Sequence, residues 1–138
     1  MADKNFAYYR SGVAHAGAYQ VAGYPYITGS SLNNNEERRV KFPTVAKSVT
    51  VISRANVEIR VHFNSKSTAD VINGKHYITL DTIEDSVTFN VKCKEIYISA
   101  AGNNASYELF ASLTGIPTSS MYELSGPGLT TGADDVDD

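Results

Sequence analysis

Apolar and polar residues alternate along the middle of the chain with a period of two. In residues 57–63, valine, isoleucine and phenylalanine occupy the odd positions, and charged residues or histidine occupy the even ones. The same alternation recurs in residues 87–91 and 107–113. A period of two places successive side chains on opposite faces of an extended strand, so these segments are predicted to be half-buried β-strands. Shorter candidate strands lie at 39–42, 48–53, 75–80 and 95–100.

Turn-forming residues separate these segments. Asn73-Gly74 is a preferred sequence for a two-residue type I′ hairpin. Gly102-Asn103-Asn104 tolerates positive φ, and residues 81–85 form a polar turn. No helical crossover separates the strands, which favours antiparallel pairing. The sequence therefore predicts an all-β protein, an antiparallel β-sandwich or jelly roll of about seven to eight strands.

Three zones of different composition divide the chain. Residues 1–37 are rich in glycine and tyrosine and are predicted to form an extended N-terminal arm, with 19–27 as an alternative edge strand. Residues 38–116 form the predicted β-sandwich core. Residues 117–138 form a C-terminal tail, whose acidic end at 134–138 is expected to be flexible. This division predicts that residues 1–28 can be deleted without loss of the folded core.

Tyrosines are concentrated in the arm, where a freely moving segment would need few of them. Tyrosine combines a large contact area with a polar tip, so these residues are predicted to dock on a partner. The C-terminal tail holds a second, lesser group of apolar candidates. The predicted partner-binding residues are Tyr8, Tyr9, Tyr19, Tyr24 and Tyr26 in the arm, and Met121, Tyr122 and Leu124 in the tail.

Composition narrows the range of partners. The chain has 138 residues and a formal net charge of −3, so no strong basic field favours nucleic acid. No apolar run has the roughly 20 residues that a membrane helix requires, and the N-terminus does not read as a signal peptide. The single cysteine, Cys93, excludes an internal disulfide. We therefore expect a protein made in a reducing cytosol, without a membrane or nucleic-acid partner.

Catalytic and metal-binding patterns are not evident. The histidines His15, His62 and His76 lack metal-ligand spacing, and His62 is predicted to be a surface residue on the outer face of its strand. Ser119-Ser120 lies in a loop-like segment without a nucleophile elbow. The acidic turn 81–85 lacks the spacing of a calcium loop. The sequence predicts no catalytic residue, no metal site, no cofactor and no enzyme.

Basic residues are concentrated in the first predicted strands. Alternation would place them on the solvent face, whereas a patch complementary to an acidic tail or an acidic protein surface is the alternative. Nucleic-acid binding ranks lower because exposed aromatic residues are not interleaved with them. These residues are Arg38, Arg39, Lys41, Lys47, Arg54 and Arg60.

The layout of the chain resembles small virion proteins of tailed bacteriophages, especially capsid decoration or cement proteins. The segments that carry this resemblance are AHAGAYQVAG (14–23) with PYITG (25–29), VKFP (40–43) leading into 48–53 and IRVHF (59–63), and KCKEIYIS (92–99) leading to YELF (107–110). The resemblance implies a mechanical role: binding to the major capsid protein on the exterior of the virion, with a homo-oligomer, such as a trimer, expected.

Two alternatives to a cement protein follow from the same features. The first is a head–tail, tail or fibre-associated module of the virion. The second is a carbohydrate-binding β-sandwich, because exposed aromatic rings can stack on sugars. The chain contains no tryptophan, which counts against the second alternative.

Overall fold

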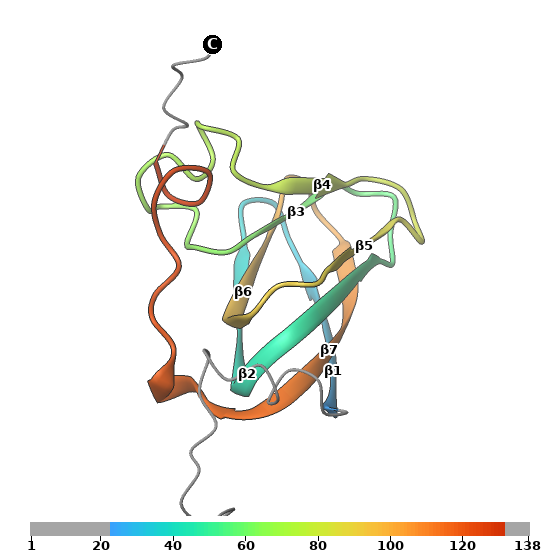
Figure 1. The fold of residues 1–138 in the computed structure, drawn as a ribbon. Helices are drawn as coiled ribbons and strands as arrows, with labels where there is room; N and C mark the ends of the chain where they lie inside the picture. Colours follow the sequence, from blue (N-terminus) through green and yellow to red (C-terminus); the bar gives the residue numbers. More distant parts are fainter. Residues whose placement is uncertain (1–22, 132–138) are drawn as a thin grey trace, which may run out of the picture.

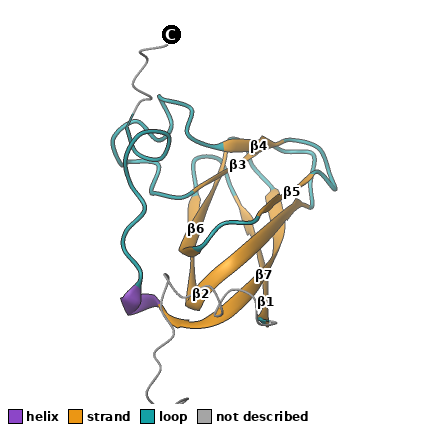
Figure 2. Cartoon of the chain, viewed as in Figure 1, coloured by secondary structure: helices purple, strands orange, loops and turns teal. Residues whose placement is uncertain are grey.

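The computed structural model describes residues 23–131, which form a single seven-stranded antiparallel sheet (Figures 1 and 2). The strand order is β1-β7-β2-β6-β3-β4, and β5 pairs with β2. The all-β antiparallel prediction is thus confirmed. The elements are β1 (Tyr24–Leu32), β2 (Glu37–Ser53), β3 (Ile59–His62), β4 (Ile78–Leu80), β5 (Ser86–Phe89), β6 (Cys93–Ala100), β7 (Ala105–Pro117) and the 3₁₀ turn η1 (Thr118–Ser120).

Strand β2 connects two parts of the sheet. The sequence predicts separate strands at 39–42 and 48–53, but the structure has one strand of 17 residues. Its first part pairs with β6, from Glu37 opposite Ser99 to Lys41 opposite Glu95. Its last part lies between β7 and β5, with Val51 opposite both Leu109 and Val87. Register shifts between Lys41 and Ser48 mark irregular pairing, which lets one strand bend from one part to the other.

The inward side chains of both parts form one hydrophobic core. Val51 and Leu109 come from one part, and Ile59, Ile96 and Ile98 come from the other; each is at most 1 % exposed. Full burial of such a side chain stabilises the fold by roughly 1.5–3 kcal/mol. The alternation predicted from the sequence therefore separates the core face from the outer face correctly in β3 and β7.

The segment after β7 (residues 118–131) packs beside the part of the sheet that contains β6. It runs from η1 along the side of the sheet to the loop that follows β3 (Figure 1). Asn64 Nδ2 donates a hydrogen bond to the carbonyl of Leu124 at 2.7 Å, and the amide of Asp70 donates to the carbonyl of Thr130 at 3.0 Å. Residues 118–131 of the predicted tail therefore pack on the sheet, whereas the acidic end lies outside the described residues.

The hairpin predicted at Asn73-Gly74 does not form. The amide of Gly74 donates a hydrogen bond to the carbonyl of Asp70 at 2.7 Å, and the amide of His76 donates one to the carbonyl of Val71 at 2.8 Å. These bonds close a helix-like turn, and its positive-φ residue is Lys75, with φ of 62°. The turn predicted at 102–104 does form between β6 and β7, where Asn104 has φ of 63°.

Candidate functional site

Strand β1 is a long free edge of the sheet. It pairs with β7 over nine residues, from Tyr24 opposite Leu113 to Leu32 opposite Ala105, and its other side has no strand partner among residues 23–131. The edge strand predicted as the alternative at 19–27 overlaps β1 at 24–27, and the structure places residues 24–32 of the predicted arm in the sheet. Half of the backbone groups of an edge strand point away from its neighbour and can pair with another chain.

The outer face of β1 and β7 carries exposed apolar side chains. Ile27 is 74 % exposed and lies opposite Phe110, which is 43 % exposed. Beside this pair is a hollow of about 420 Å³, lined by Ile27, Gly29, Ile52, Glu108 and Phe110 among others. A Cβ atom at Gly29 would lie 2.7 Å from the carbonyl oxygen of Tyr107, so only glycine permits the close approach of β1 and β7 there.

The structure separates the predicted docking residues of the arm. Tyr24, at the start of β1, is 67 % exposed and available to a partner. The Tyr26 ring is half-buried and packs edge-on against Phe42, with 5.5 Å between the ring centroids. Tyr26 therefore belongs partly to the core. Tyr8, Tyr9 and Tyr19 lie outside the described residues.

The predicted docking residues of the tail are also separated. Met121 is 5 % exposed and packs with Val45 and Ile116, so it is a core residue and its side chain is not available to a partner. Tyr122 is 55 % exposed, and Lys92 Nζ lies 5.4 Å from the centroid of its ring. Leu124 is partly buried against the core.

Sequence reasoning missed Ile27 and Phe110 as surface residues. Phe110 shares the phase of Glu108 in the alternation of β7, and that phase faces outward. An aromatic residue at a polar position of a two-faced strand was the available signal. No comparable signal marked Ile27, because its phase became clear only once β1 was placed beside β7.

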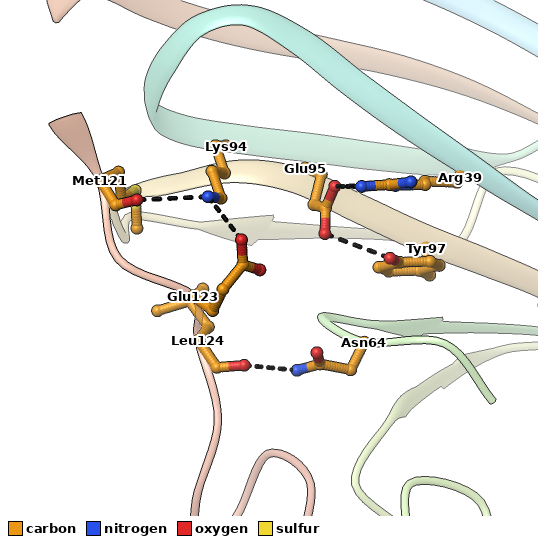
Figure 3. Close-up of polar contacts among 8 residues, drawn as sticks. All are labelled: Arg39, Asn64, Lys94, Glu95, Tyr97, Met121, Glu123 and Leu124. Atoms are coloured by element: carbon orange, nitrogen blue, oxygen red, sulfur yellow. Dashed lines mark hydrogen bonds and ion pairs between the residues drawn. The ribbon is translucent and has the colours of Figure 1, made fainter. Parts of the chain in front are cut away.

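Polar contacts fix the segment after β7 to β6 (Figure 3). Lys94 Nζ donates to the carbonyl of Met121 at 3.2 Å and lies 2.7 Å from Glu123 Oε2. This ion pair and its hydrogen bond lower the pKa of the Glu123 carboxyl. Because Lys94 bonds two positions of the segment, the cluster has a clear structural role.

The neighbouring carboxylate of Glu95 is enclosed by two donors (Figure 3). It accepts hydrogen bonds from Arg39 Nε at 2.8 Å and from the Tyr97 hydroxyl at 3.1 Å. The contact raises the pKa of Arg39, and burial together with the Glu95 charge raises the pKa of Tyr97. These two hydrogen bonds hold the Glu95 side chain in place.

Three of the six basic residues of the first predicted strands pair with carboxylates of the same chain. This arrangement supports the solvent-face interpretation over a patch that awaits an acidic partner. The pairs are Arg39 with Glu95 at 2.6 Å, Arg60 with Glu58 at 2.8 Å and Arg54 with Glu108 at 3.8 Å. Exposed pairs of this kind stabilise a fold by only about 0–1 kcal/mol each.

His62 is buried, which corrects the prediction of a surface residue. It faces outward from β3, but the ring is stacked on Tyr97 and the residue is only 1 % exposed. Its Nδ1 lies 2.6 Å from the carbonyl of Asn64, so Nδ1 donates; Nε2, 2.9 Å from the Ser99 hydroxyl, accepts. Both contacts fit a neutral imidazole. Burial lowers the pKa of His62, although the bond to Asn64 opposes this shift.

We expect acid to destabilise the protein through His62. Because its pKa in the folded state lies below the ordinary value of 6.5, the unfolded chain binds the proton more readily. The contribution of His62 to the free energy of unfolding is therefore fully present above pH 6.5. It falls as pH decreases, by at most about 1.4 kcal/mol per pH unit for one proton. Urea unfolding between pH 7.5 and pH 5 measures this slope.

The variant for this measurement is His62→Gln, whose side chain does not bind a proton in this pH range. His62→Gln should flatten the pH dependence of the free energy of unfolding relative to the wild-type protein. An unchanged slope in His62→Gln would contradict the assignment.

The described residues offer little metal or thiol chemistry. Among residues 23–131, no group of three histidine, cysteine, aspartate or glutamate side chains could hold a metal ion. Cys93 is fully buried, and burial raises its pKa to about 12, so the thiol stays protonated at neutral pH. No helix in this part of the chain is long and apolar enough to span a membrane.

Comparison with protein families, with curated proteins and with solved structures finds no match to this chain.

Proposed function

We propose that this chain is a non-enzymatic structural protein of a bacteriophage virion, a cement or decoration protein that binds the major capsid protein on the exterior of the shell. The observation that carries the proposal is Tyr24, 67 % exposed at the start of a free edge strand. It directly follows an arm that contributes Tyr8, Tyr9 and Tyr19 in sequence. The resemblance to phage virion proteins supports the same role; it rests on residues 14–23 and 25–29, on 40–43, 48–53 and 59–63, and on 92–99 and 107–110.

The proposed binding mode needs a large contact area and a long docking segment, and it needs no reactive groups. Tyrosine side chains bury a large surface at low cost in conformational entropy, which suits them as anchors in a partner's pockets. In this proposal the arm and Tyr24 act together in docking, with a β-sandwich or jelly roll as the platform. Repeated attachment by several copies on one shell would multiply weak contacts through effective concentration.

The test uses phage heads assembled without this protein. Purified wild-type protein, a variant lacking residues 1–22 and Tyr24→Ala are each sedimented with such heads. We expect both variants to bind at least about tenfold more weakly, because anchor residues carry most of the binding energy. Val91→Ala is the matched control, since Val91 is 44 % exposed on another part of the surface. Full-strength binding by the variant that lacks residues 1–22 would contradict the docking role of the arm.

Copy number per virion separates a shell protein from a head–tail, tail or fibre module. Hundreds of copies, measured by quantitative mass spectrometry of purified virions, would agree with decoration of the shell. A dozen or fewer would place the protein at a single vertex or in the tail, because those locations offer few symmetry-related sites.

The observations do not favour a carbohydrate-binding function. A hollow of about 320 Å³ between β4 and β5 is lined by Phe63, Tyr77 and Phe89. However, the guanidinium carbon of Arg60 lies 5.0 Å from the centroid of the Tyr77 ring and occupies one of its faces. Phe63 and Phe89 pack edge-on against each other, 5.3 Å apart. The rings therefore stabilise the loop instead of forming an open stacking platform.

A further inference from the structure

The edge of β1 differs from the other free edges among residues 23–131. β4 and β5 have three and four residues, whereas β1 has nine and carries no charged side chain. Natural edge strands are commonly protected from pairing by shortness, charge or proline. In β1 the single such residue is Pro25, next to the end of the strand. Tyr26 to Leu32 thus form an unprotected edge.

A protruding side chain and a hollow lie on either side of Thr28. Ile27 projects from the outer face and is 74 % exposed, and Gly29 leaves that face open beside Phe110 and Ile52. When two copies of a strand pair antiparallel about Thr28, residue 27 of one copy lies opposite residue 29 of the other. Each Ile27 then meets the hollow of the other copy, so the surface is complementary to itself.

Charge and proline position also suit this register. Because β1 has no charged residue, pairing of two copies places no like charges opposite each other. The carboxylate beside the hollow, Glu108, lies 3.8 Å from Arg54 of the same chain. Pro25, which cannot donate a hydrogen bond, falls opposite Ser31 at the periphery of the paired segment.

We propose that two copies of this chain pair through β1, antiparallel about a two-fold axis at Thr28, with the Ile27 side chain of each copy filling the hollow over Gly29 of the other. The contact extends the sheet from one copy to the next and removes an apolar surface from water. A contact that uses the same patch on both copies closes as a dimer. It therefore differs from the trimer that the resemblance implies, and it does not depend on the proposed function.

Disulfide cross-linking tests the register. In a pairing centred on Thr28, two cysteines in Thr28→Cys lie directly opposite each other, within the Cα separation that a disulfide accepts. In Ser30→Cys, on the same face, the two cysteines would be displaced by four residues, or about 13 Å. We expect mild oxidation to cross-link Thr28→Cys and not Ser30→Cys; native Cys93 is buried in both. Equal cross-linking of the two variants, or none in either, would overturn the proposal.

Sedimentation of the purified full chain tests the dimer without any capsid. The wild-type protein should have about twice the chain mass of 14.9 kDa. Ile27→Lys should be monomeric, whereas Ile83→Lys, with Ile83 45 % exposed in the turn between β4 and β5, should remain dimeric. The wild-type protein could instead be monomeric while its Ile27→Lys variant loses attachment to heads. In that case the edge of β1 binds the capsid protein. This result would overturn self-pairing and leave the proposed function standing.

Discussion

Replacing Ile98 with alanine is expected to lower the free energy of unfolding by about 2–5 kcal/mol. Ile98 is fully buried in β6, opposite Val61 of β3, where the two parts of the sheet share their core. Removing its side chain loses apolar burial and leaves a cavity that neighbouring strands cannot readily close. Urea denaturation should show a lower midpoint with an unchanged slope.

Ile83→Ala provides the matched comparison for Ile98→Ala. The same atoms are removed, but Ile83 is 45 % exposed in a turn. Its stability change should stay within about 0.5 kcal/mol. If both substitutions shifted the midpoint equally, the assignment of Ile98 to a shared core would be wrong.

Deletion of residues 1–32 is expected to abolish the soluble folded state, whereas deletion of residues 1–22 should preserve it. The longer deletion removes all of β1, including Leu32, which is 1 % exposed. It also exposes the inward side chains Tyr107, Leu109 and Leu113 of β7 at a new sheet edge. An exposed apolar edge of 13 residues is a site for aggregation.

Circular dichroism and size-exclusion chromatography compare the two deletions. The variant lacking residues 1–22 keeps every strand found in residues 23–131 and should melt cooperatively near the wild-type temperature. The sequence predicts that residues 1–28 are dispensable, but this cut falls inside β1 and removes Tyr26 from its contact with Phe42. A soluble, cooperatively folded chain beginning at residue 33 would show that β1 is not part of the folding unit.

The candidate site was predictable only in part. Tyr24 was expected to be a docking residue because of its type and its place in a tyrosine-rich segment, and the structure leaves it exposed. Met121 was expected to be a lesser docking residue, yet it is buried with Val45 and Ile116. Residue type indicates what a side chain can do, whereas its availability depends on which distant segments pack against it.

The fold shows the same difference between what local sequence determines and what distant segments determine. The sequence alone determined the all-β class, the strands β3 within 57–63 and β7 around 107–113, and the turn at 102–104. Alternation and turn chemistry act between near neighbours in the chain. Only the tertiary structure joined two short segments into β2, placed β1 as a free edge and covered His62. Each of these depends on pairing between residues far apart in sequence, which no local pattern records.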